Sequence, residues 1–114
     1  MQVLVVDGEF LVALEAEQVL ADSLGLKVEI AMPRISASTI RERRHDIVIV
    51  DAALVLDNRR DLASALRGSD AAIIFWSFDN EHLHGLPSWD GIPVISKPFD
   101  DEILVGVVRN VAAR

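Results

Sequence analysis

A run of four consecutive β-branched residues most constrains how this chain can fold. It occupies residues 47–50 (IVIV), between Asp46 and Asp51, and shows no alternation of apolar and polar side chains. A strand of this composition is buried on both faces, as in a parallel sheet that helices cover on each side. In open α/β sheets, ligands bind beyond the carboxyl ends of the strands. Asp51, which ends this run, is therefore the first candidate for a functional residue.

Other apolar runs along the chain predict four more strands, at residues 3–6, 28–31, 71–76 and 92–96. Apolar periodicity and glycine stops predict helices at 10–24, 33–44 and 59–67, a loop at 52–58 and only a short helix between 78 and 91. Strands that alternate with helices form a parallel sheet with right-handed crossovers. We therefore predict an α/β fold in a single domain, 1–114: a doubly wound, five-stranded parallel sheet, flavodoxin-like (βα)5, with strand order 2-1-3-4-5.

The final helix carries the clearest sequence signals. Asp100 is suited to cap its start, and Arg109 and Arg114 suit the negative end of its dipole. One continuous apolar stripe is expected along it, at Ile103, Leu104, Val107, Val108 and Val111. The helix at 10–24 shows a similar stripe, at Ala13, Ala16, Leu20 and Leu24, and Gly25 is a natural stop after it.

Composition narrows the classes of function. A net charge of −7 argues against general nucleic-acid binding, which needs a basic face. The absence of cysteine removes disulfides and thiolate metal sites. No apolar run approaches the length of a membrane span, and the N-terminus lacks a signal-peptide pattern. We therefore expect a cytoplasmic protein that binds neither membranes nor nucleic acid.

Four of the five predicted strands end on a residue with chemistry: Asp7, Asp51, Ser77 and Lys97. In the order 2-1-3-4-5, strands one and three flank the switch point, so Asp7 and Asp51 should lie side by side. Two facing carboxylates repel unless a cation lies between them, which suggests a divalent metal, most simply Mg²⁺. Ser77 and Lys97 can hold the oxygens of an anion built onto Asp51. Such a set of groups suits phosphoryl transfer to a side chain.

Each of these residues also has a structural interpretation. An acid after a strand is often only a helix cap, which applies to Asp7 taken alone, and a lone serine such as Ser77 is often a turn residue. Lys97 is harder to explain in this way, because it is one of only two lysines and precedes a proline. His82 and His84 are two residues apart in a polar loop, and we predict that both are solvated and bind no metal.

The chain resembles the receiver domains of two-component response regulators over essentially its whole length. The resemblance is carried by residues 3–7 (VLVVD), 46–51 (DIVIVD), 73–77 (IIFWS) and 93–99 (PVISKPF). The last segment is the most specific. In that family the Lys-Pro peptide bond is cis, so the resemblance implies a cis bond between Lys97 and Pro98, against a background of about one in twenty X-Pro bonds.

The resemblance also implies roles for individual residues. A histidine kinase or histidine phosphotransfer protein would donate a phosphoryl group to Asp51, and Ser77 and Lys97 would bind its oxygens. Mg²⁺ would be held by Asp7, Asp51 and the backbone carbonyl of Ala53. The face of the fourth helix, fifth strand and last helix would then change shape and contact a downstream protein. The protein would not be an enzyme beyond self-phosphorylation and autodephosphorylation at Asp51, and a homodimer stays open.

The sequence departs from the family at three positions. Gly8 replaces the second of two acids after the first strand, which is normally a direct metal ligand, so we expect weak Mg²⁺ binding. Glu9 is adjacent, but its side chain should leave the backbone in another direction. Phe78 is bulky where the family has a small residue that leaves a route to the aspartate. Val94 replaces the switch aromatic of the fifth strand.

These departures leave alternatives open. The leading hypothesis is a single-domain receiver that is phosphorylated on Asp51. A degenerate pseudo-receiver, acting as an interaction module without phosphorylation, is the second, favoured by Gly8 and Phe78. A small phosphatase-like hydrolase that uses Asp7 as nucleophile and Glu9 as acid is a minor alternative. No Gly-x-Gly turn follows any strand, so a dinucleotide site is weaker still.

Overall fold

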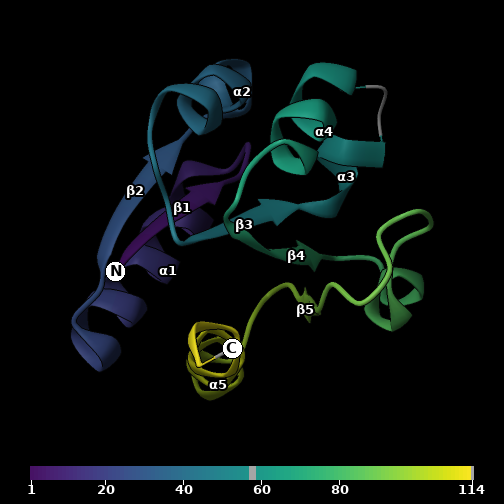
Figure 1. The fold of residues 1–114 in the computed structure, drawn as a ribbon. Helices are drawn as coiled ribbons and strands as arrows, with labels where there is room; N and C mark the ends of the chain where they lie inside the picture. The colour runs from purple at the N-terminus through teal and green to yellow at the C-terminus, as the bar shows by residue number, and fades with distance from the viewer. Residues whose placement is uncertain (57–58, 114) are drawn as a thin grey trace.

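Five parallel strands form one sheet through the centre of the molecule (Figure 1). The computed structural model describes residues 1–56 and 59–113. The strands are β1 (Gln2–Val6), β2 (Lys27–Ala31), β3 (Ile47–Asp51), β4 (Ala72–Ser77) and β5 (Val94–Ser96). Their order is β2-β1-β3-β4-β5, and every adjacent pair is parallel. The α/β fold and the strand order predicted from the sequence are therefore confirmed.

Helices cover both faces of the sheet (Figure 1). The first face carries α1 (Phe10–Leu24) and α5 (Asp101–Ala112), and the second carries α2 (Pro33–Glu42), α3 (Ala52–Leu56) and α4 (Arg60–Arg67). Alternate residues of β1 point to opposite layers: Val3 and Val5 join the core under α1 and α5, whereas Leu4 and Val6 join the core under α2 and α4. Burial on both faces explains why the strand sequences show no alternation.

The first two helices follow the predicted signals closely. The buried side of α1 contains Ala13, Ala16 and Leu20, and Gly25 ends the helix with a left-handed φ of 65°. In α2, Pro33 occupies the first turn, and Ser36, Ala37 and Ile40 are buried. This helix ends at Glu42, slightly before the predicted end at 44.

The segment after β3 was predicted as a loop at 52–58, which is wrong for its first part. Residues Ala52–Leu56 form the helix α3, and residues 57–58 lie outside the described part of the chain. Asp51 Oδ1 accepts a hydrogen bond from the Ala53 N–H at 3.0 Å, so the strand-ending aspartate itself satisfies a donor of the new helix. The segment contains only alanine, leucine and valine, and Leu54 and Val55 pack against the core.

The connection between β4 and β5 contains a single short helical turn, η1 (Asn80–His84), as predicted for this stretch. The residues after this turn cover part of the sheet with their side chains. Leu86 and Trp89 are buried, and the Trp89 ring packs edge-on against Phe75 with 5.3 Å between ring centres. The Arg67 guanidinium lies 3.8 Å from the centre of the Trp89 ring. The Trp89 side chain thus packs on the sheet in a segment that contains only one short helical turn.

The last strand and helix differ from the prediction in detail. β5 begins at Val94 rather than at residue 92, and Pro93, which has no N–H to donate, contributes only its carbonyl to Phe75. Asp100 caps α5 by accepting hydrogen bonds from the next residues' backbone, as expected. The apolar stripe is interrupted, because Ile103 is 56% exposed. Arg109 lies in the last turn, and Arg114 is outside the described residues.

Candidate functional site

Lys97 joins Asp7 and Asp51 at the carboxyl edge of the sheet. Its Nζ donates hydrogen bonds to Asp7 Oδ2 at 2.7 Å and to Asp51 Oδ2 at 2.9 Å. Asp7 follows β1, Asp51 ends β3, and these two strands are neighbours, as the predicted order requires. The structure therefore brings together three of the four residues at which the sequence predicted chemistry.

The two carboxylates differ in access. The Asp7 side chain is 1% exposed, and the Asp51 side chain is 20% exposed. Asp7 Oδ1 accepts a hydrogen bond from the Glu9 N–H at 2.8 Å, which fixes the turn after β1, and Glu9 is the N-cap residue immediately before α1. Asp7 is therefore not the cap of that helix. A reagent that approaches this edge meets Asp51 first.

Lys97 is held by both its backbone and the aromatic side chains around it. Its N–H donates to the Ser77 carbonyl at 2.8 Å, which extends the ladder between β4 and β5. The peptide bond to Pro98 is cis, as the family resemblance implies. The Nζ atom lies 4.6 Å from the centre of the Phe78 ring and 5.6 Å from that of Trp76. Lys97 is 4% exposed, whereas Phe78, whose ring it contacts, is 58% exposed.

Two opposing effects act on the pKa of Lys97. Burial alone would lower it, because desolvation disfavours the ammonium form. The hydrogen bonds to Asp51 and Asp7, and the charges of the same groups, outweigh the burial and raise the pKa above its usual range. Lys97 is therefore protonated at neutral pH, and its positive charge offsets one of the two neighbouring negative charges.

Ser77 reaches the same edge, but its hydroxyl is bonded elsewhere. Its Oγ lies 2.7 Å from His82 Nδ1 and accepts from the Asp79 N–H at 3.0 Å. The prediction that His82 is solvated is wrong, since its side chain is only 22% exposed and contacts a buried serine. The available signal was Asp79, which caps η1 and so turns His82 back toward the end of β4. His84 is exposed, as predicted.

The predicted metal ligands provide a small set of donors. Asp7 and Asp51 are within reach of one lysine, while Gly8 offers no side chain and the Glu9 residue is exposed. Within the described residues, no group of three or more acidic, histidine or cysteine side chains could hold a metal ion. Mg²⁺ is commonly held by one or two carboxylates together with water and phosphate oxygens. The two aspartates fit that minimal mode, and the role of the Ala53 carbonyl stays a prediction.

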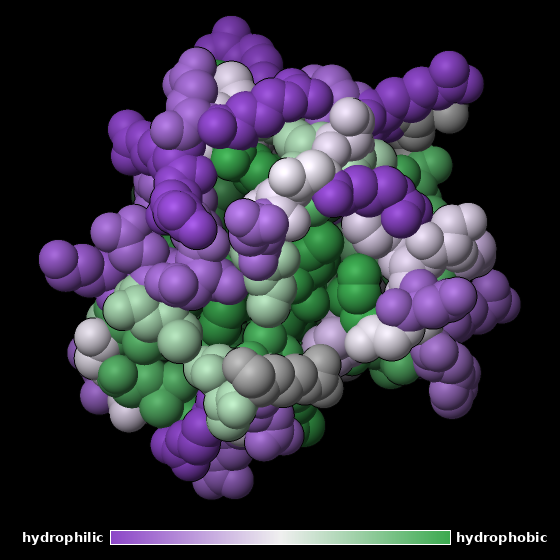
Figure 2. Space-filling view, viewed as in Figure 1, coloured by the Kyte–Doolittle hydropathy of each residue, from purple (hydrophilic) through white to green (hydrophobic). Residues whose placement is uncertain are grey.

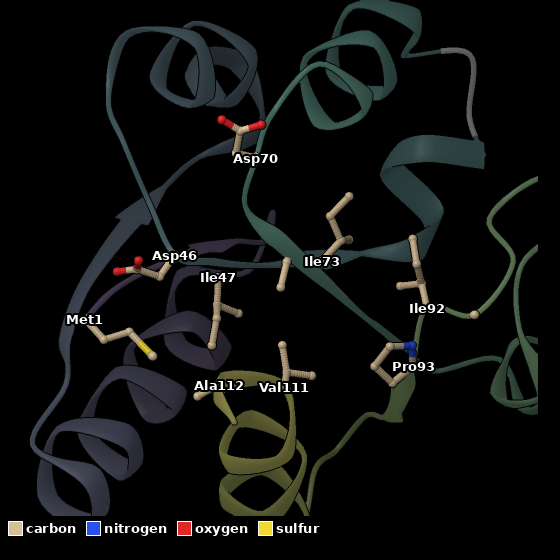
Figure 3. A pocket seen from close by; sticks show the side chains of 11 residues that line it. Met1, Asp46, Ile47, Asp70, Ile73, Ile92, Pro93, Val111 and Ala112 are labelled. Atoms are coloured by element: carbon tan, nitrogen blue, oxygen red, sulfur yellow. The ribbon is translucent and has the colours of Figure 1, made fainter. Parts of the chain in front are cut away.

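A cavity of about 400 Å³ opens at the opposite, amino end of the sheet (Figure 3). The space-filling view from this side shows a hollow of apolar surface surrounded by hydrophilic side chains (Figure 2). Asp46, which also lines the cavity, accepts a hydrogen bond from the Gln2 N–H at 2.7 Å and so has a structural role. None of the residues predicted for the site lines this cavity. The candidate site therefore lies at the other edge of the sheet, the carboxyl edge.

Several solved structures resemble this chain over nearly its whole length. The receiver domain of Francisella response regulator 1452 matches with a TM-score of 0.76 at 19% identity, covering 99% of this chain and 97% of that one. A Chloroflexus aurantiacus protein described as a response regulator gives 0.81 at 24% identity, covering 99% and 98%. Chemotaxis protein CheY4 of Vibrio cholerae gives 0.72 at 21% identity, covering 96% and 97%. This chain has the receiver-domain fold.

This result confirms the fold that was predicted from the resemblance of four short sequence segments to receiver domains. No protein-family model and no curated protein matches the sequence. The likeness is thus one of architecture. None of the helices within residues 1–56 and 59–113 is long and apolar enough to cross a membrane.

Proposed function

We propose that this receiver domain accepts a phosphoryl group on Asp51 from a histidine kinase or histidine phosphotransfer protein and signals by protein contact. The observation that carries the proposal is the Lys97 ammonium, which is hydrogen-bonded to both Asp7 and Asp51 while only Asp51 is partly open to solvent. An accessible carboxylate beside a fixed cation is suited to act as a phosphoryl acceptor, because stabilisation of charge dominates this chemistry.

The transfer itself would use residues in distinct ways. An Asp51 carboxylate oxygen forms a bond to phosphorus as the bond from phosphorus to the donor's histidine nitrogen breaks. The Asp51 carboxylate thereby loses its negative charge, and the phosphoryl group attached to it carries two negative charges. Lys97 keeps its hydrogen bond to Asp7 and donates to a phosphoryl oxygen, a charge-assisted interaction. Ser77 supplies a neutral donor from the neighbouring strand.

Mg²⁺ is part of this proposal. Asp7 and Asp51 would hold it, with the carbonyl of Ala53 as a further ligand, and the ion would neutralise charge on the phosphoryl oxygens. Binding should be weak, because Gly8 contributes no carboxylate and Lys97 already satisfies an oxygen of each aspartate. We expect a substantial occupancy only with Mg²⁺ in excess.

Exposed apolar side chains in the segments that follow the strands support a protein donor. Among the described residues eight large hydrophobic side chains are exposed; Met1 precedes β1, and the other seven follow the carboxyl end of a strand in the chain: Phe10, Leu11, Met32, Ile35, Leu56, Phe78 and Ile103. Exposed apolar surface marks sites of protein contact where such side chains form a continuous patch. The downstream partner would use the face of α5 and β5, as the family resemblance implies.

Mass spectrometry after incubation with acetyl phosphate and Mg²⁺ tests the proposal. The wild-type protein should gain one phosphoryl group that is labile to hydroxylamine, and Asp51→Asn should gain none. Asp46→Asn is the matched control, since this acid lies at the opposite edge of the sheet, and it should be phosphorylated like the wild type. Absence of any adduct on the wild-type protein contradicts the proposal.

The second candidate is a pseudo-receiver that binds its partner without phosphorylation. It is favoured by the Lys97 ammonium, which already bridges the two carboxylates, and by the absence of a third acid at Gly8. In that case Asp51→Asn would leave partner binding unchanged. The hydrolase hypothesis is disfavoured, because its nucleophile Asp7 is 1% exposed and lies beneath Lys97.

A further inference from the structure

A short polar chain connects Ser77 to the helical turn η1. Ser77 Oγ lies 2.7 Å from His82 Nδ1, and on the far side of the imidazole ring Nε2 lies 3.7 Å from Asp79 Oδ2. The Asp79 N–H donates to the same Ser77 Oγ at 3.0 Å. Ser77 is 4% exposed, so its hydroxyl depends on these partners. The proposed transfer to Asp51 uses Ser77 but leaves His82 and Asp79 without a role.

The surroundings of the imidazole ring determine which nitrogen carries the proton. Ser77 Oγ accepts from the Asp79 N–H and has a second lone pair, so the tautomer of His82 sets the direction of the hydrogen bond between Ser77 Oγ and His82 Nδ1. The carboxylate of Asp79 faces Nε2 and favours the N–H at that position. The Ser77 proton is therefore directed at His82, and it cannot be donated to a phosphoryl oxygen at the same time.

We propose that His82 is a positioning residue that holds the Ser77 hydroxyl away from the phosphoryl site until Asp51 is modified. This inference rests on the function proposed above. A phosphoryl group on Asp51 competes for the Ser77 proton, and Ser77 breaks its bond to His82 when it turns to donate. The turn η1 then loses its side-chain link to the end of β4. Phosphorylation is thus read out first as a release of residues 80–84.

This coupling takes the place of a switch aromatic on β5. At that position the chain has Val94, whose short side chain has no aromatic ring and no hydroxyl group to respond to a movement of Ser77. His82 lies five residues after Ser77 and already contacts it, so the signal passes directly into the β4–β5 connection. The β5–η1 contact then places the change beside the edge strand of the sheet.

The affinity for beryllofluoride, with Mg²⁺ in excess, tests the inference. His82→Leu should bind this phosphoryl mimic about fivefold more tightly than wild type, because one neutral hydrogen bond no longer has to be broken. His82→Asn should restore the wild-type affinity, since its side-chain oxygen can accept the Ser77 proton where Nδ1 did. His84→Ala, a change in the same turn at an exposed residue, should have no effect.

Nitrogen-15 spectra of the histidine side chains give a second measurement that does not depend on a variant. In the free protein, His82 should carry its proton on Nε2, and Nδ1 should show the shift of a hydrogen-bonded acceptor. Beryllofluoride should move the Nδ1 resonance of His82 and leave His84 unchanged. A proton on Nδ1 in the free protein, or an unmoved Nδ1 resonance in the complex, overturns the inference.

The outcomes separate the two proposals. If wild-type protein binds no beryllofluoride at any Mg²⁺ concentration, the proposed function fails and this inference fails with it. If wild type binds but His82→Leu has the same or a lower affinity, only the inference fails. Failure of His82→Asn to restore the wild-type affinity would show that the ring acts through packing rather than through its acceptor nitrogen, which also overturns it.

Discussion

Lys97 illustrates what a sequence conveys about a single residue and what it does not. The sequence placed Asp7, Asp51 and Lys97 at one edge, because each follows a strand of a parallel sheet, and the structure confirms that placement. The Mg²⁺ ion expected between the two carboxylates stays a prediction. The sequence did not predict that the Lys97 ammonium reaches both of them, because side-chain length and rotamer are not encoded in the spacing of strand ends.

Removal of the Lys97 charge should cost more stability than an ordinary surface change. In Lys97→Met, the buried carboxylate of Asp7 loses its cation, and breaking a buried pair typically costs about 3–5 kcal/mol of unfolding free energy. Lys27→Met, at the other, exposed lysine, should change that free energy by less than about 0.5 kcal/mol. Urea denaturation measures both. Equal stabilities for the two variants would show that Asp7 does not need Lys97.

Gly8 provides a direct test of the weak-metal prediction. A Cβ built at Gly8 would be 3.9 Å from Pro33 Cγ, an ordinary contact, so Gly8→Asp can be accommodated. The added carboxylate should tighten Mg²⁺ binding by about tenfold, since ligand charge sets affinity at such sites. Gly8→Asn has the same shape without the charge and should gain little. If calorimetric titration shows no gain from Gly8→Asp, Glu9 or another group already fills this role.

At the scale of elements, the sequence predicted best where a pattern was long. The helices α1 and α5 and all five strands were found, because their apolar positions repeat over several turns or form unbroken runs. The helix α3 was missed, since five residues are too few for a period to show. The packing of Trp89 on the sheet was missed as well, because it depends on a contact with Phe75, which is distant in the sequence.

The buried Trp89 side chain should contribute substantially to the free energy of unfolding. Trp89→Ala removes a buried ring that packs on Phe75 and lies under Arg67, and truncations of this kind cost about 3–5 kcal/mol. Asp90→Ala, at the exposed neighbouring residue, should stay within about 0.5 kcal/mol of wild type. Thermal and urea unfolding measure the difference. A cost below about 1 kcal/mol would mean that the segment of residues 85–93 is not part of the core.

At the scale of the whole molecule, the sheet separates two apolar layers, and the candidate site lies at the edge where they meet. One layer holds Trp76 under α1 and α5, and the other holds Trp89 under the helices of the opposite face. Because both layers pack on the same five strands, we expect them to unfold together.

The two tryptophans allow this cooperativity to be measured, because each reports on one layer. In Trp76→Phe only Trp89 fluoresces, and in Trp89→Phe only Trp76 does. The first change removes an indole N–H that is buried without a hydrogen-bond partner among the described residues, and this offsets part of the cost of placing a smaller ring in the core. For each variant we expect the urea midpoint from fluorescence to equal the midpoint from far-ultraviolet circular dichroism, as in a two-state transition. If the fluorescence of one variant changes at a lower urea concentration than its dichroism, the layer that contains its remaining tryptophan loosens by itself.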